Sequence, residues 1–159
     1  KVWDFVEVYK EKYREISNQK TKLLENAKNA VELAHSFATL GVVTTKTGRF
    51  SKILLDHFGI LDKFGVVIGR EDVERPKPDK EPMIKAIIAL NTSSKDTFMI
   101  GDTCMDMESA RKANVKGLGV KCGYGDADTL GVCAEYLFED ALQAVKYIRT
   151  LYINSLTGG

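Results

Sequence analysis

Polar residues that could do chemistry follow successive apolar runs of this 159-residue chain. Thr44 and Thr45 follow one run, Lys77 stands between two prolines after the next, and Asp102 and Asp106 follow a third. In a parallel sheet, the carboxyl ends of the strands meet at one edge, where ligands bind. Hydroxyl groups, an amine and two carboxylates at one edge suit a phosphoryl group and a hard divalent cation such as Mg²⁺.

Each of these residues also has an ordinary structural interpretation. Thr44 is β-branched and suits a strand, and a lysine between two prolines fits a solvated loop. Asp102 and Asp106, at a predicted helix start, suit helix capping and the helix dipole. The order of these residues along the chain therefore carries the functional interpretation, and no single residue does.

Short apolar segments alternate with amphipathic ones, which is the pattern of βαβ units. The strands are expected near 42–44, 66–68, 97–100, 118–122 and 135–138. The helices are expected near 22–40, closed by Gly41, and near 50–58, 80–90, 104–114 and 139–153. Strands this apolar are buried on both faces. The sequence therefore predicts an α/β protein with a Rossmann-like, doubly wound parallel sheet that presents the candidate residues at one edge.

Composition excludes several other classes. Lys and Arg number 23 against 22 Asp and Glu, so a net charge of +1 lacks the basic surface that a nucleic-acid binder needs. The longest apolar runs are far shorter than the ~20 residues that span a bilayer. Cys104, Cys122 and Cys133 have no Cys-x-x-Cys spacing, which favours reduced thiols in a cytoplasmic protein. We therefore expect no nucleic-acid and no membrane partner.

The order strand–Thr, Pro-Lys-Pro and strand–Gly-Asp-x-x-x-Asp resembles the haloacid dehalogenase superfamily, and within it the phosphoglycolate-phosphatase-like branch. Residues 42–46 resemble the second motif of that family, residues 75–82 the third and residues 99–110 the fourth. Residues 119–125 resemble the strand and loop that follow in this branch. The third and fourth motifs together are specific, whereas the threonine alone is a weak signal.

The resemblance implies a Mg²⁺-dependent phosphatase that acts on a small phosphorylated metabolite, with phosphoglycolate as the first candidate. Thr44 and the Thr45 amide would hold a phosphoryl oxygen, and Lys77 would balance the charge that develops on it. Asp102 would ligate Mg²⁺, and Asp106 would act through water or by supporting a ligand. The family's nucleophile is an aspartate that forms an aspartyl-phosphate.

One departure from the family concerns that nucleophile. The family begins with a strand that bears an Asp-x-Asp-Gly-Thr motif, and no such motif stands before the helix expected over 22–40. Residues 126–129 (Asp-Ala-Asp-Thr) lack the glycine and follow a Gly-Tyr-Gly loop, so we interpret them as a surface loop. Residues 3–16 have a helical apolar period and would be the last helix of a cap. The expected division is therefore a cap remnant over 1–19 and an α/β core over 20–159 that lacks its first strand.

The missing strand would be central in the sheet, between the strands that end at Thr44 and Gly101. Without it, buried backbone groups would lose partners at ~1–3 kcal/mol each, against a total stability of ~5–15 kcal/mol. We therefore expect an upstream segment, in the same chain or from another one, to supply the strand and the aspartate. The 159 residues alone are expected to be inactive, and the protein to be a monomer or a homodimer.

The main alternative within the superfamily is a phosphomutase of the β-phosphoglucomutase type. That branch tends to have Glu-Asp-Ser and no second acid in the fourth motif, so Gly101-Asp102-Thr103 with Asp106 favours a phosphatase.

Other classes stay open or fit less well. A receiver-like module combines the same residue types in the reverse order, with the acids first and the lysine near the end. A non-catalytic interaction module stays open, because no nucleophile motif is present. A dinucleotide-binding module is disfavoured, because Gly117-Leu118-Gly119 lacks the third glycine at the right offset.

Overall fold

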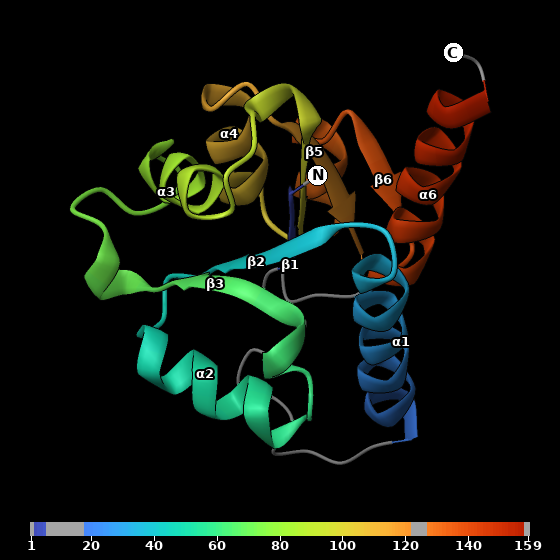
Figure 1. The fold of residues 1–159 in the computed structure, drawn as a ribbon, viewed down its shortest axis with the longest axis horizontal. Coiled ribbons are helices and arrows are strands. Elements are labelled where there is room, and N and C mark those ends of the chain that lie inside the picture. The colour runs from blue at the N-terminus through green and yellow to red at the C-terminus, as the bar shows by residue number, and fades with distance from the viewer. Residues whose placement is uncertain (1, 6–17, 122–126, 158–159) are drawn as a thin grey trace.

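The computed structural model describes residues 2–5, 18–121 and 127–157 of the chain (Figure 1). Within these ranges, parallel strands form one sheet in the spatial order β3-β2-β1-β4-β5-β6. The strands are β1 (Val2–Phe5), β2 (Thr39–Val43), β3 (Phe64–Ile68), β4 (Thr97–Gly101), β5 (Lys116–Val120) and β6 (Tyr136–Phe138).

Helices connect the strands. They are α1 (Asn18–His35), α2 (Gly48–His57), α3 (Glu81–Ala89), α4 (Cys104–Lys112), α5 (Ala127–Cys133) and α6 (Ala141–Thr157), with short 3-10 turns η2 (Leu61–Lys63), η3 (Arg70–Asp72) and η4 (Ser94–Asp96). Each strand and helix predicted from residue 22 onward is present, with shifted ends. The predicted α/β class with a doubly wound parallel sheet is confirmed.

The helices cover both faces of the sheet (Figure 1). Successive residues of a strand point to opposite faces, and the two core clusters divide accordingly. The cluster under α3 and α4 contains Val43, Ile68, Met83, Ala86, Ile87, Met99 and Ala110. The cluster under α1 and α6 contains Ala30, Val31, Leu40, Val42, Ile100, Leu118, Val145 and Ile148. Burial on both faces explains why the strands are continuous apolar runs.

The first strand corrects one prediction. Val2–Phe5 pairs in parallel with β2 on one side and with β4 on the other, so the helix expected over 3–16 is wrong for residues 3–5. The helical apolar period begins only at Val6, whereas Val2, Trp3 and Phe5 belong to residue types that favour strands. The remainder of that expected helix, residues 6–17, lies outside the described residues.

The expectation that the central position of the sheet would be unfilled is also wrong. Strand β1 occupies it, so β2 and β4 both keep a neighbour on their inner side. The inner strands require backbone partners, and any strand-forming segment can supply them. Residues 2–5 pair within the sheet, and the division into a cap remnant over 1–19 and a core over 20–159 stays a prediction.

The register of β1 bears on the chemistry of the sheet edge. Asp4 is level with Gly41 in β2 and with Met99 in β4. Those two residues precede Thr44 and Asp102 by three positions each, which is about 10 Å along a strand at ~3.3 Å per residue. Strand β1 therefore completes the sheet, but its aspartate lies well before the edge where the candidate residues lie.

Helix α5 begins at Ala127, so the interpretation of residues 126–129 as a loop is wrong for 127–129, although Asp128 and Thr129 are exposed. Asp126 lies outside the described residues. Leu130 is 1% exposed, and a Cβ on Gly119 of β5 would lie 3.3 Å from its Cδ2 atom. Leu130 of α5 therefore packs closely on β5. The polar residues that precede it in the sequence do not indicate this contact.

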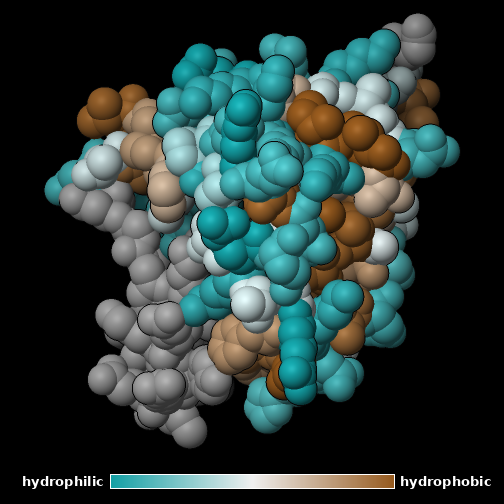
Figure 2. Space-filling view, turned by 90° about the vertical axis from the view of Figure 1, so that its left-hand side faces the viewer, coloured by the Kyte–Doolittle hydropathy of each residue, from teal (hydrophilic) through white to brown (hydrophobic). Residues whose placement is uncertain are grey.

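The surface is largely hydrophilic on the face that Figure 2 shows, and hydrophobic side chains gather along its right-hand margin. The large apolar side chains that stand exposed include Phe50, Ile53, Ile88, Met105, Val132, Ile153 and Leu156. Among the described helices, every one is too short or too polar to cross a bilayer.

Candidate active site

The predicted site residues come together at the carboxyl edge of the sheet. Thr44 and Thr45 directly follow β2, and Asp102 directly follows β4, on either side of β1. Neighbouring strands lie about 4.8 Å apart, so the ends of β2 and β4 are separated by about 10 Å. Of residues 119–125, which resemble the strand and loop that follow in the family, residues 122–125 lie outside the described residues.

Thr44 is the first residue after β2 and is 9% exposed. Its backbone N–H donates to the Ile68 carbonyl at 3.0 Å, which continues the pairing of β2 with β3. Its hydroxyl oxygen accepts a hydrogen bond from the Lys46 N–H at 3.1 Å. The hydroxyl group is therefore oriented by the backbone, and its own O–H can donate to an oxygen of a bound molecule.

Lys77 is 5% exposed, although it lies on the loop between β3 and α3. Its Nζ donates to Asp106 Oδ1 at 2.6 Å and to the Val43 carbonyl at 3.4 Å. The Lys77–Pro78 peptide bond is cis. The ammonium group thus bridges the end of β2 and helix α4, which is unlike a solvated loop lysine.

Asp106 is 0% exposed and is held at the start of α4. Its Oδ2 accepts from the Thr103 hydroxyl at 3.0 Å and from the Thr103 N–H at 3.3 Å, while the Asp106 N–H donates to the Thr103 hydroxyl oxygen at 3.3 Å. This is a reciprocal capping box. A Cβ on Gly101 would lie 2.5 Å from Asp106 Oδ2, so the absence of a side chain there admits the carboxylate.

Asp102 is the other buried carboxylate at this edge, at 1% exposure. Among the described residues, no group of three or more His, Cys, Asp and Glu side chains is arranged to hold a metal. Mg²⁺ is nevertheless bound in many proteins through one or two carboxylates, with water and phosphate oxygens completing the shell. The donor types at this edge therefore fit Mg²⁺, and because Asp106 is paired with Lys77 and Thr103, Asp102 is the candidate ligand.

Two supporting residues were not predicted from the sequence. Ser109, in the second turn of α4, donates through its hydroxyl to the Asp79 carbonyl at 2.7 Å and so ties α4 to the loop of Lys77. Glu71 Oε1 accepts from the Gly48 N–H at 2.7 Å. The sequence signal available for Ser109 was a small polar residue on the buried face of a predicted helix. For Glu71 the sequence offered no signal except that it follows the strand that ends before Gly69.

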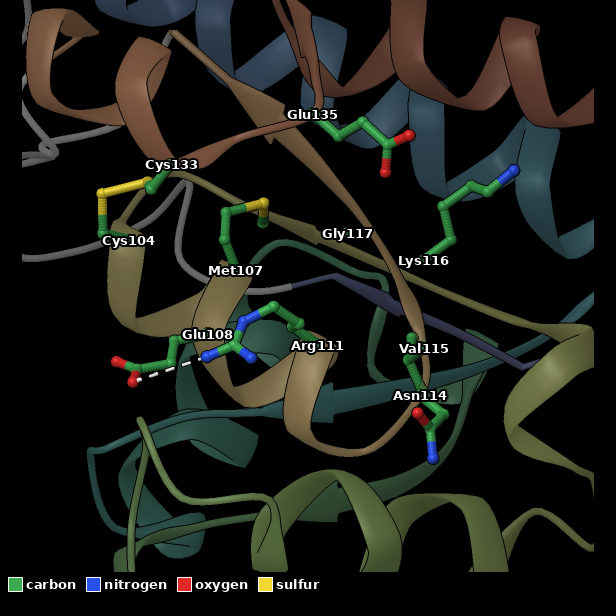
Figure 3. Close-up of a pocket in the computed structure, with 10 residues that line it drawn as sticks. All are labelled: Cys104, Met107, Glu108, Arg111, Asn114, Val115, Lys116, Gly117, Cys133 and Glu135. Atoms are coloured by element: carbon green, nitrogen blue, oxygen red, sulfur yellow. Dashed lines mark ion pairs between the residues drawn. A yellow bond between two sulfur atoms is a disulfide. The ribbon is translucent and has the colours of Figure 1, made fainter.

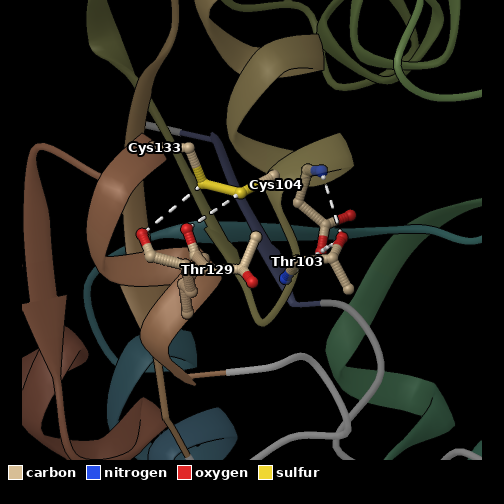
Figure 4. The surroundings of a disulfide bond; sticks show 6 residues. Thr103, Cys104, Thr129 and Cys133 are labelled. Atoms are coloured by element: carbon tan, nitrogen blue, oxygen red, sulfur yellow. Dashed lines mark hydrogen bonds between the residues drawn. A yellow bond between two sulfur atoms is a disulfide. The ribbon is translucent and has the colours of Figure 1, made fainter.

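A disulfide joins Cys104, the first residue of α4, to Cys133, the last residue of α5 (Figure 4). The prediction of reduced thiols is therefore wrong for this pair, and Cys122 lies outside the described residues. The two Cα atoms are 5.8 Å apart although 29 positions separate them in the sequence. Only the packing of α5 beside the start of α4 brings them together, and sequence spacing alone could not indicate it.

A cavity of about 630 Å³ lies along α4 and β5, and the disulfide forms part of its wall (Figure 3). Its lining includes Met107 and Gly117 as well as the charged residues Glu108, Arg111, Lys116 and Glu135. None of the five predicted site residues lines this cavity. The candidate active site is therefore the sheet edge, where the buried charges are, and not this cavity.

Comparison with known proteins identifies the class. The sequence matches the family model of haloacid dehalogenase-like hydrolases over residues 1–120. The chain therefore belongs to this family of hydrolases, as its motifs predicted.

Particular relatives extend this finding. A protein named as a pyrophosphatase, PpaX, from Caldanaerobacter subterraneus subsp. tengcongensis is 32% identical over 143 residues, which cover 89% of this chain and 64% of that protein. The phosphoglycolate phosphatase of Salmonella paratyphi A is 29% identical over 121 residues, or 76% of this chain and 48% of that protein.

A solved structure agrees in fold. The crystal structure of a predicted phosphoglycolate phosphatase from Haemophilus somnus superposes with a TM-score of 0.71 at 24% identity, over 77% of this chain and 56% of the other. The chain thus spans about half to two thirds of the length of these proteins.

Proposed function

We propose that this chain is part of a Mg²⁺-dependent phosphatase that hydrolyses the phosphate monoester of a small metabolite, with phosphoglycolate as the first substrate to test. The observation that carries the proposal is the buried ammonium of Lys77. It is 5% exposed and bridges Val43, next to Thr44, and Asp106, on the helix that follows Asp102. A cation at the sheet edge is suited to the negative charge of a phosphoryl group.

The residues divide the work of binding. The Thr44 hydroxyl and the Thr45 N–H would donate to one phosphoryl oxygen, on the side of β2. Lys77 would balance the charge that accumulates as the ester bond breaks, because a fixed cation in a water-poor place is most effective there. Asp106 would keep the Lys77 ammonium in position, since its Oδ1 accepts from Nζ at 2.6 Å.

Asp102 would hold the cation on the side of β4. A bound Mg²⁺ would supply positive charge to a phosphoryl oxygen and orient the group. Asp106 would support this arrangement only indirectly, because the structure pairs both of its oxygens with protein donors.

The attacking carboxylate is the remaining part of the proposal. Asp102 is assigned to the cation, Asp106 is paired with Lys77, and Asp4 lies three positions before the edge. We therefore expect the nucleophile to come from outside the described residues. The 159-residue chain alone should hydrolyse no phosphoester above background with Mg²⁺ present, and robust turnover by it would show that the nucleophile has been misplaced.

The test of Lys77 uses the full-length protein with phosphoglycolate and an aryl phosphate, with Mg²⁺ and with EDTA. Lys77→Met should reduce kcat by roughly 10²–10³-fold, the scale of losing one oxyanion donor. Lys80→Met is the matched control, because this exposed lysine lies on the same loop. Equal rates in the two variants, or hydrolysis unaffected by EDTA, would contradict the proposal.

The test of the metal site is calorimetry with Mg²⁺. Asp102→Asn should weaken Mg²⁺ binding by at least the roughly 10–100-fold that supporting residues of metal sites contribute, because a direct ligand charge is removed. Asp106→Asn should weaken it less, since its oxygens face Lys77 and Thr103. An unchanged affinity in Asp102→Asn would remove Asp102 from the metal site.

A further inference from the structure

We propose that Glu71 is a positioning residue that fixes the anion-binding loop, here defined as residues 44–48. Glu71 lies on the loop that follows β3. Its Oε1 accepts a hydrogen bond from the Gly48 N–H at 2.7 Å and so joins this loop to residues 44–48. Gly48 is the first residue of α2 and is buried. The catalytic consequence rests on the proposed phosphatase function, whereas the contact itself does not.

The geometry between the two loops leaves little freedom. A Cβ on Gly69 would lie 2.2 Å from the Gly48 nitrogen, and a Cβ on Gly48 would lie 3.1 Å from Glu71 Oε1. The backbones of Gly48 and Gly69 therefore approach each other more closely than any side chain between them would allow. This close approach brings the Glu71 carboxylate within hydrogen-bond distance of the Gly48 N–H.

Two further contacts hold the same loop from the same side. The Thr44 N–H donates to the Ile68 carbonyl at 3.0 Å, and the Arg70 N–H donates to the Lys46 carbonyl at 2.8 Å. Both are backbone contacts that most substitutions leave intact. The contact of Glu71 is made by a side chain, so it is the one that mutation can remove cleanly.

The charge of Glu71 gives the contact a second role. The N-terminus of a helix attracts anions, and α2 begins next to the residues proposed to bind phosphate. The Glu71 carboxylate occupies the Gly48 amide and places negative charge at this helix end. A phosphoryl group is therefore directed away from the start of α2 and toward Thr44 and Thr45.

The experiment compares three variants of the full-length protein. In Glu71→Ala, KM for the phosphorylated substrate should rise about 10–150-fold with kcat within about 2-fold, the scale of one hydrogen bond to a charged group. In Glu71→Gln, the amide oxygen still accepts from Gly48 but the negative charge is lost, so the part of the effect that comes from the hydrogen bond should be rescued and the part that comes from the charge should remain. Glu74→Ala is the matched control, because Glu74 is an exposed carboxylate on the same loop.

A second readout does not require activity. Hydrogen exchange of the Gly48 amide should accelerate in Glu71→Ala, while the amides of β4 keep their protection and report an intact fold. An unchanged Gly48 amide or an unchanged KM in Glu71→Ala would overturn the proposal. If the wild-type protein hydrolyses no phosphomonoester, the proposed function fails, and the exchange of the Gly48 amide still decides whether Glu71 fixes the loop.

Discussion

Helix α4 carries two kinds of ion pair, and they differ in almost every physical respect. At its start, Asp106 pairs with Lys77 at 2.6 Å, and the two side chains are 0% and 2% exposed. Further along, Glu108 pairs with Arg111 at 3.9 Å (Figure 3). It also pairs with Lys112 at 3.3 Å, and the Glu108 side chain is 44% exposed. The first pair links the loop of Lys77 to the start of α4, and the second lies within one helix.

The difference in burial separates the ion pair at the sheet edge from the ion pairs on the surface of α4. A buried pair loses solvation that its Coulomb energy and hydrogen bonds must offset, so it is weak support for stability as such. Exposed pairs cost little and contribute little. The buried pair of Lys77 and Asp106 is therefore consistent with the phosphatase site proposed above, whereas the pairs of Glu108 fit an ordinary solvated helix surface.

The largest expected effect comes from breaking the buried pair. Asp106→Ala should lower the free energy of unfolding by about 3–5 kcal/mol, because the Lys77 ammonium stays buried without the carboxylate it faces. Urea unfolding of the chain, followed by circular dichroism, measures this loss. A loss below 1 kcal/mol would mean that Lys77 turns to solvent with ease.

A double-mutant cycle sharpens the same test. Lys77→Met with Asp106→Leu should be less destabilised than the sum of the two single variants, because the double variant buries no lone charge. Strict additivity of the losses would show that the two side chains do not interact in solution.

The disulfide is expected to have the next largest effect. It closes a segment of 29 positions, and a loop of that length corresponds to about 3–4 kcal/mol in the chain-entropy model. Cys133→Ser should lose about this much stability, and reduction of the wild-type chain should lose the same. Thiol titration of the denatured, unreduced chain should find Cys122 alone reactive, and three reactive thiols would refute the bond.

The cap of α4 is expected to contribute less. Thr103 accepts from the Asp106 N–H and donates to its carboxylate, and loss of an N-cap costs about 0.5–2 kcal/mol. Thr103→Ala should show a loss in this range in urea unfolding. Thr103→Ser keeps the hydroxyl and is the control; an equal loss in both variants would assign the effect to the methyl group.

The order of elements and most of the site were predictable, because both depend on local patterns. Apolar runs gave the strands of the sheet from β2 onward. The residues just after two of those runs gave Thr44 and Asp102, and the two flanking prolines marked Lys77. Boundaries were less accurate. Gly41, expected to close a helix, lies within β2, where a Cβ would come within 2.9 Å of the Leu90 side chain. Its role is close packing, which a single sequence does not display.

Contacts between distant segments could not be predicted in the same way. The pairing of Cys104 with Cys133 depends on how α5 packs beside α4, and the contact of Glu71 with Gly48 on how two loops meet. The place of Val2–Phe5 was missed because four residues are too few to show a strand period against a helical one that starts directly afterwards.

The smallest loss of stability is expected when the exposed ion pairs of Glu108 on α4 are removed. Glu108→Gln removes the charge that faces Lys112 and Arg111 at 3.3 and 3.9 Å, while the length and helix propensity of the side chain hardly change. Exposed pairs of this spacing contribute about 0.2–0.5 kcal/mol, so the urea midpoint should shift only slightly. The shift should vanish in 1 M salt, because the Debye length then falls to about 3 Å. A loss comparable to that of Asp106→Ala would mean that burial does not separate the two kinds of pair.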